Sequence, residues 1–144
     1  MISEKAILGI CLLFCLACFG CITEEEGKLD INDPVIDIRS PAINQTYVAE
    51  WGGAWPEGEP VLLEAKGMDD VKVESIQVTI SNSKGDIVLD KVFENLTDND
   101  LELTLSESFT AKQVDVYSVV FIVIDSSGNR TTSNARTFSY VGYS

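Results

Sequence analysis

Apolar and polar residues alternate along most of the chain after Val35, with the two-residue period of β-strands. Ile76, Val78 and Ile80, for example, are separated by Gln77 and Thr79. Runs rich in Val, Ile, Thr and aromatic residues, separated by turn residues, cover 35–39, 46–50, 60–66, 71–81, 86–93, 101–109, 114–125 and 135–141. Helical spacing is nowhere sustained, so the pattern predicts an all-β fold, a single antiparallel β-sandwich of about seven strands.

Two stretches refine this prediction. The segment 82–86 is expected to form a hairpin turn centred on Gly85, because such turns need a positive φ. The run "VVFIVI" (119–124) is apolar on both faces, which favours a central strand covered on both sides. The alternative is that the outer face of this strand contacts a partner.

The N-terminus has the features of an export signal. A short polar start with Lys5 precedes an apolar run over residues 6–20, and the chain then becomes abruptly polar. The run is shorter than the ~20 residues of a membrane-spanning helix and is typical of a signal peptide. We therefore predict a signal peptide over 1–20, an acidic tether over 21–33 and a folded domain over 34–142.

The break at Cys21, directly after Gly20, resembles a lipoprotein signal. The resemblance implies that Cys21 is lipidated and becomes the new N-terminus, with Cys18, after Ala17, as the rival acceptor. An uncleaved signal anchor is the alternative. Either attachment predicts an exported domain, at the cell surface or facing the periplasm, that is held on a membrane.

The composition excludes several functions. The formal net charge of -13 disfavours nucleic acid, whose binding requires neutralised phosphates, and suits basic partners or divalent cations. All four cysteines lie within the first 21 residues and histidine is absent. The folded domain therefore lacks the residues for a Cys/His zinc site, a Ser-His-Asp triad or a Cys-His dyad, and we expect no enzyme.

Three segments, "IRSPAINQTYVAE", "GEPVLLEAKGMDD" and "VDVYSVVFIVIDSSGNRTT", resemble the immunoglobulin-like domains of microbial surface proteins. The likeness covers residues 34–141 and implies an immunoglobulin-like sandwich closest to cadherin and fibronectin type III domains. Tyr117 resembles the tyrosine corner of these folds. The implied function is a non-enzymatic structural, adhesive or partner-binding module. The alternatives are an accessory subunit of a membrane-bound envelope complex, or a carbohydrate-binding module.

The predicted strand order places the start of the domain and three loops at one end of the sandwich. This end gathers "DIND" (30–33), "DD" (69–70), "DND" (98–100) and "DSSGN" (125–129). Calcium takes six to eight oxygen ligands, so we predict a calcium site. Its candidate ligands are Asp30, Asn32, Asp33, Asp69, Asp70 and Asp125.

The stretch "DINDP" is similar to the calcium-binding linker of cadherins, "D–x–N–D–N–x–P". By this resemblance Asp30, Asn32 and Asp33 would be ligands beside the loop of Asp125, although Pro34 stands where the second Asn is expected. The alternative interpretation is that these residues populate a tether and turns because their side chains bond to their own backbone.

Two further groups of residues are candidate sites. Trp51 and Trp55 could stack on sugar rings or anchor a protein partner, or else cap the core. Asn44, Asn95 and Asn129 each begin an N-glycosylation sequon, which requires an exposed Asn in an exported chain. Asn129 cannot easily carry a glycan and also lie beside a calcium ion.

Overall fold

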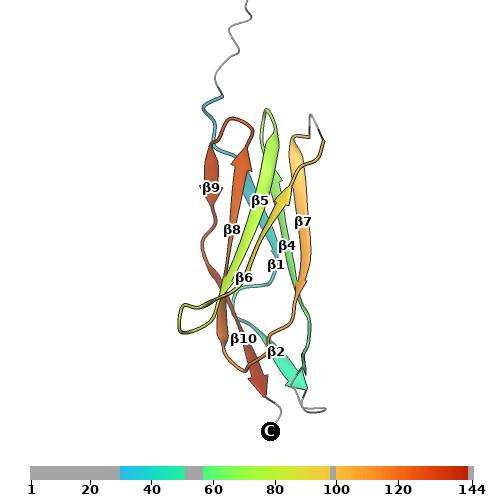
Figure 1. The fold of residues 1–144 in the computed structure, drawn as a ribbon, viewed down its shortest axis with the longest axis vertical. Coiled ribbons are helices and arrows are strands. Elements are labelled where there is room, and N and C mark those ends of the chain that lie inside the picture. The colour runs from blue at the N-terminus through green and yellow to red at the C-terminus, as the bar shows by residue number, and fades with distance from the viewer. Residues whose placement is uncertain (1–29, 51–56, 98–99, 143–144) are drawn as a thin grey trace, which may run out of the picture.

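The computed structural model describes residues 30–50, 57–97 and 100–142, and within these ranges the chain is all-β with no helix (Figure 1). Sheet A has the strand order β1-β4-β7 and consists of β1 (Val35–Ser40), β4 (Val61–Met68) and β7 (Glu102–Phe109). Sheet B has the order β3-β2-β10-β8-β5-β6, with β9 paired to β8. Its strands are β2 (Gln45–Glu50), β3 (Glu57–Gly58), β5 (Val73–Ser81), β6 (Ile87–Glu94), β8 (Val116–Asp125), β9 (Arg130–Thr132) and β10 (Arg136–Gly142).

Neighbouring strands are antiparallel, with one exception among the described pairs: β2 and β10 run parallel over Gln45–Ala49 and Phe138–Gly142. This pairing arises because residues 35–50, which the sequence predicts as one split strand, divide between the two sheets. The first half, β1, pairs with β4, and the chain then crosses to sheet B, where β2 joins β10.

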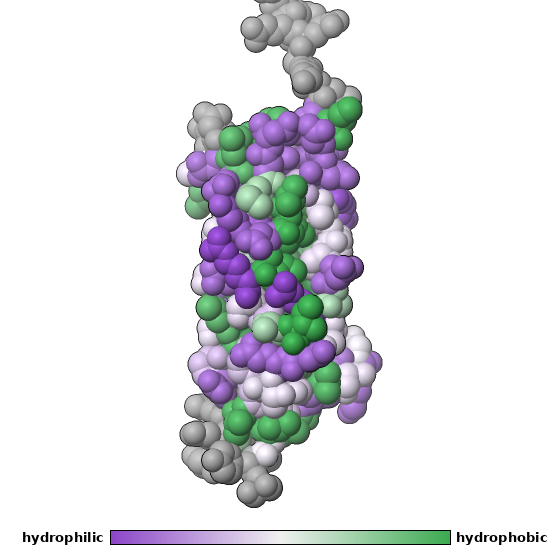
Figure 2. Space-filling model, turned by 180° about the vertical axis from the view of Figure 1, so that it is seen from behind, coloured by the Kyte–Doolittle hydropathy of each residue, from purple (hydrophilic) through white to green (hydrophobic). Residues whose placement is uncertain are grey.

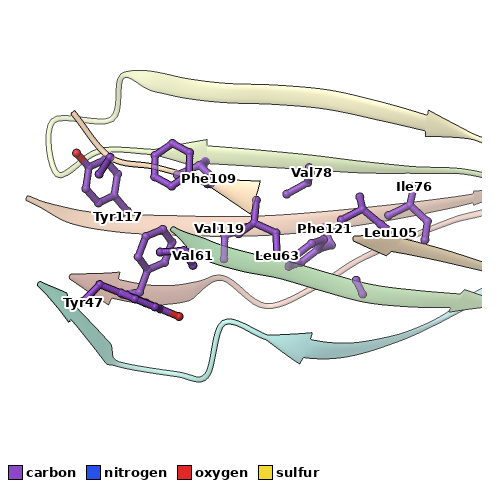
Figure 3. Close-up of a cluster of buried hydrophobic side chains, with 14 of the residues drawn as sticks. Tyr47, Val61, Leu63, Ile76, Val78, Leu105, Phe109, Tyr117, Val119 and Phe121 are labelled. Carbon is purple, nitrogen blue, oxygen red and sulfur yellow. The ribbon is translucent and has the colours of Figure 1, made fainter. Parts of the chain in front are cut away.

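The two sheets face each other around one core, which the predicted alternation builds. In β4, Val61, Leu63 and Ala65 are fully buried while the residues between them face outward. The largest fully buried side chains come from both sheets (Figure 3) and are Tyr140, Phe121, Phe138, Leu63, Ile76, Ile80, Leu105, Val61, Val73, Val78, Val119 and Val123. Burial of these apolar side chains is the main stabilising contribution to the fold.

The prediction for "VVFIVI" is confirmed in one respect and wrong in another. The strand β8 is central in sheet B, with β5 on one side and β9 and β10 on the other. Its outward residues Val120, Ile122 and Ile124 are, however, half-buried, and no further layer covers them within the described ranges. Neighbouring strands shield part of these side chains and leave the rest exposed.

The described residues form ten strand segments, where the sequence predicted about seven strands. The excess comes from the split first strand and from β3 and β9, which are two and three residues long. Segments this short contain no alternation that a sequence pattern can detect. The predicted turn at 82–86 is present, with Gly85 at a φ of 86°.

The outer face of sheet A, seen from behind in Figure 2, mixes hydrophilic and hydrophobic side chains. Three ion pairs lie on it within the described residues: Arg39–Asp37 within β1, Arg39–Glu64 between β1 and β4, and Lys66–Glu102 between β4 and β7. The open sides of the two sheets are also linked. Lys91 of β6 pairs with Glu107 of β7, and Arg136 donates to the carbonyls of Ile38 and Pro41 at 3.0 and 2.9 Å. These side chains occupy strand edges that could otherwise pair with another chain.

Candidate metal site where the tether joins the domain

Three of the predicted calcium ligands meet at the end of the molecule where the tether joins the domain, at the top of Figure 1. Asp30 lies before β1, Asp69 directly follows β4 and Asp125 ends β8. One carboxylate oxygen of each lies within 4.8 Å of those of the other two. We call Asp30, Asp69 and Asp125 the carboxylate cluster.

Asp125 is the most rigidly held member and is only 2% exposed. Its Oδ1 accepts hydrogen bonds from the backbone N–H groups of Ser127 and Asn129, both at 2.8 Å. Its Oδ2 accepts one from the Asn129 side-chain amide at 2.8 Å. The turn after β8 therefore wraps around this carboxylate, and Gly128 supplies the positive φ of 90° that the turn needs.

Asp69 is fixed by the turn that follows it. Its Oδ2 accepts hydrogen bonds from the N–H groups of Val71 at 2.9 Å and Lys72 at 3.0 Å. Its Oδ1 accepts none within the described part of the chain. One oxygen of this carboxylate is thus free to bind a ligand.

Asp30 connects the tether to the domain. Its backbone carbonyl accepts a hydrogen bond from the Asn129 side chain at 3.3 Å, and its Oδ1 accepts one from the backbone of Asn32 at 3.0 Å. Its Oδ2 is buried and has no hydrogen-bond partner. It is the one buried side-chain polar atom without a partner among residues 30–50, 57–97 and 100–142.

The cluster has the properties of an oxygen-ligand cation site. No described Lys or Arg forms an ion pair with any of its three carboxylates, so their negative charges are uncompensated within the described residues. Calcium binds oxygens at about 2.4 Å, and two oxygens on one ion therefore lie at most about 4.8 Å apart. The separations in the cluster fit this limit, and the unpartnered Asp30 Oδ2 is an oxygen that a cation would satisfy.

The other three predicted ligands lie beside the cluster. Asn32 donates its side-chain amide to Asp70 Oδ2 at 2.9 Å, and both are exposed. Asp33 is exposed and, with Asn32, Asp70 and Met68, borders an open depression next to Asp69.

The sequence did not reveal that Asn129 orients both Asp125 and Asp30. The spacing in "DSSGN" was the available signal, because a side chain four residues after an Asp can close a turn onto it.

The remaining predicted site residues fall into two groups. Cys18, Cys21, Trp51 and Trp55 lie outside the described residues. The sequon residues are described: Asn44 is exposed, Asn129 is half-buried and Asn95 is buried. The expectation of an exposed Asn is therefore wrong for Asn95, because its side chain bonds to the backbone of two neighbouring segments.

In the described ranges, no helix is long and apolar enough to cross a membrane.

No protein-family model matches the chain, and no curated protein matches it. Among solved structures it is similar to an engineered protein from the Northeast Structural Genomics Consortium, with a TM-score of 0.47 and 18% identity. The match covers 76% of this chain and 20% of the engineered protein, so the chain spans about a fifth of that protein's length.

Proposed function

We propose that this protein is a membrane-anchored, extracytoplasmic immunoglobulin-like module with a non-enzymatic structural, adhesive or partner-binding role, in which calcium fixes the folded domain to its acidic tether. The observation that supports the calcium-bound junction is the carboxylate cluster. Asp30 belongs to the tether, whereas Asp69 and Asp125 belong to the domain. A cation shared by the three would therefore set the angle at which the tether leaves the domain.

Two features support the immunoglobulin-like assignment. The hydroxyl of Tyr117 donates to the carbonyl of Gln113, four residues upstream, at 2.9 Å, which is the contact of a tyrosine corner. If β1 and β2 are counted as one split strand and the short β3 and β9 as extensions, seven principal strands remain in the two sheets. That number is the one expected for the smaller immunoglobulin-like sandwiches.

Export and anchoring rest on the sequence: the apolar run over 6–20, the break at Cys21 and the acidic residues of the tether. The non-enzymatic role rests on the absence of histidine and the confinement of cysteine to the first 21 residues. A carbohydrate-binding role through Trp51 and Trp55 stays a prediction.

Thermal unfolding of the full chain in detergent, with chelator or with millimolar calcium, tests the calcium junction. At a free calcium concentration ten times Kd, binding contributes about 1.4 kcal/mol of stability. For a domain of this size we expect the Tm to rise by roughly 5–10 °C. Asp30→Asn and Asp125→Asn should each abolish most of this rise.

Asp33→Asn is the matched control. The sequence assigned Asp33 as a ligand, but the structure places it outside the cluster, so this variant should keep the calcium-dependent rise. An unchanged Tm for the unmodified protein, or an equal rise in Asp30→Asn, would contradict the proposal.

The second candidate is the accessory subunit of an envelope complex. The observation that favours it is an apolar area on the outward face of sheet B. On this face Val120, Ile122 and Ile124 of β8 are half-buried, and Val92 of β6 is 54% exposed. Obligate co-purification with membrane subunits would support this function, whereas a monomeric, freely soluble domain would support the first.

A further inference from the structure

The three sequons differ in whether their acceptor nitrogen is free. An Asn side-chain amide has two N–H donors, and an N-linked glycan replaces one of them with a bond to sugar. An Asn can therefore carry a glycan in the folded protein only if at least one N–H is not needed and the nitrogen can be reached from solvent.

Asn95 fails both conditions. It is 8% exposed, and its Nδ2 donates to the carbonyls of Val73 at 2.9 Å and Asp100 at 3.4 Å. Its Oδ1 accepts from both the backbone N–H and the hydroxyl of Thr97. The hydrogen bonds of this side chain hold Thr97 and Asp100, which lie between β6 and β7, against Val73 at the start of β5.

Asn129 also has both N–H donors in use. Its Nδ2 donates to Asp125 Oδ2 at 2.8 Å and to the carbonyl of Asp30 at 3.3 Å. A glycan on this nitrogen would break one of these bonds and would place a sugar beside the carboxylate cluster. The sequence analysis found that Asn129 cannot easily carry a glycan and also lie beside a cation. The hydrogen bonds of its amide disfavour the glycan.

Asn44 has the opposite arrangement. It is exposed in the turn between β1 and β2, at a φ of 59°. Its backbone N–H donates to the carbonyl of Thr137 at 2.7 Å, and its Oδ1 accepts from the Thr137 hydroxyl at 2.7 Å. These contacts fix the side chain through its oxygen and backbone. Its Nδ2 has no partner in the described part of the chain.

We propose that Asn44 is the site of N-linked glycosylation in the folded protein, and that Asn95 and Asn129 are not acceptors. The donor is a polyprenyl-phosphate-linked oligosaccharide, acted on by an oligosaccharyltransferase. Asn44 Nδ2 forms a bond to the anomeric carbon of the first sugar as the bond from that carbon to the phosphate oxygen breaks. The polyprenyl phosphate leaves with the bonding electrons, and the amide loses one proton to a base of the transferase.

The test compares the folded and the urea-unfolded full chain as acceptors. It uses an oligosaccharyltransferase that modifies synthetic peptides spanning each of the three sequons and that remains active in the urea employed. Glycopeptide mass spectrometry gives the occupancy of each site. We expect Asn44 to be modified in both states, and Asn95 and Asn129 to be modified at least tenfold less in the folded chain than in the unfolded chain.

Three variants separate the sequon from the local structure. Asn44→Gln and Thr46→Ala should each remove the glycan from the folded protein. Ser139→Ala removes the hydroxyl that lies 3.3 Å from the Thr46 hydroxyl but keeps the sequon, so it should be glycosylated like the unmodified protein. Failure of folded Asn44 to react, or equal occupancy of Asn95 or Asn129 in the folded and unfolded chains, would overturn the proposal.

Discussion

Aspartate and asparagine side chains organise the end of the domain at which the tether joins it. Asp69 and Asp125 each bond to backbone N–H groups two to four residues further on, as short polar side chains do in turns. This is the behaviour that the turn interpretation of the acidic loops predicts. Asp30 differs, because its Oδ2 is buried without a partner, and this oxygen is the observation that favours the proposed cation site over an ordinary set of turns.

Asn95 provides a prediction at the residue scale. Replacing it with Ala removes a buried side chain that donates to the carbonyls of Val73 and Asp100 and accepts from Thr97. Loss of such bonds should lower the free energy of unfolding by about 2–3 kcal/mol, measured by urea denaturation.

Asn134→Ala is the matched control, because Asn134 is exposed and should change stability by less than about 0.5 kcal/mol. If both variants had the same stability, the hydrogen bonds of Asn95 would not hold the segment between β6 and β7.

The residues of the cluster could be predicted from the sequence only in part. Strand order alone brings the loops after β4 and β8 to the same end as residue 30. Which of two adjacent acids faces the cluster depends on the turn conformation, and Asp69 does so while Asp70 bonds to Asn32. Neighbouring side chains on an extended or turning chain point in different directions, so a pattern of residue types could not separate them.

The side chain of Val123 on β8 lies close to the backbone of β4 at Gly67. A Cβ atom placed on Gly67 would lie 2.9 and 3.1 Å from the two methyl carbons of Val123, and 3.4 Å from Ile76. The sequence predicted that this strand covers residues 60–66. In the structure β4 continues to Met68, because Gly67 marks a close approach of side chains rather than a turn.

Gly67 gives a prediction at the scale of elements. Gly67→Ala should lower the free energy of unfolding by about 1–3 kcal/mol, because the core must shift to accept the methyl group. Val123→Ala alone should also destabilise the protein, since it leaves a cavity.

The double variant is the decisive measurement for this contact. Val123→Ala removes two methyl groups and so makes room for the one methyl group that Gly67→Ala introduces. The double variant should therefore be more stable than the sum of the two single effects by about 0.5–3 kcal/mol in urea denaturation. Strict additivity would show that the two positions do not compete for the same space.

At the scale of the whole molecule, the carboxylate cluster and a group of buried aromatic rings lie toward opposite ends. The carboxylate cluster lies where the tether joins, whereas Tyr47, Phe109 and Tyr117 lie toward the other end (Figures 1 and 3). With Phe138 and Tyr140 they form a group of rings in stacked and edge-to-face contact. Burial raises the pKa of Tyr47, Tyr117 and Tyr140 above the ordinary value of 10.0. The nearby charges of Glu59 and Asp115 add to this rise for Tyr47 and Tyr117 respectively.

These pKa shifts predict alkaline unfolding. Above pH 10 the tyrosines of the unfolded chain lose protons while the three buried ones keep theirs, so folding requires proton uptake. The stability contributed by the three residues is fully present below the unfolded pKa, and it falls as the pH rises toward their folded pKa values.

We expect the urea midpoint to be unaffected by these tyrosines between pH 7 and 9 and to fall steeply above about pH 10. Tyrosinate absorbance should rise together with unfolding measured by circular dichroism. Ionisation of the buried tyrosines before any loss of structure would contradict this prediction. Tyr47→Phe should make the fall less steep.

The parallel pairing of β2 with β10 has a mechanical consequence. Residue 30 lies at one end of the molecule and β10 runs to the other, so a force between residues 30 and 142 pulls β2 and β10 along their axes in opposite directions (Figure 1). The paired residues from Gln45–Phe138 to Ala49–Gly142 are then loaded in shear and must yield together rather than one after another. This strand arrangement is therefore suited to resist stretching along the line between residue 30 and residue 142.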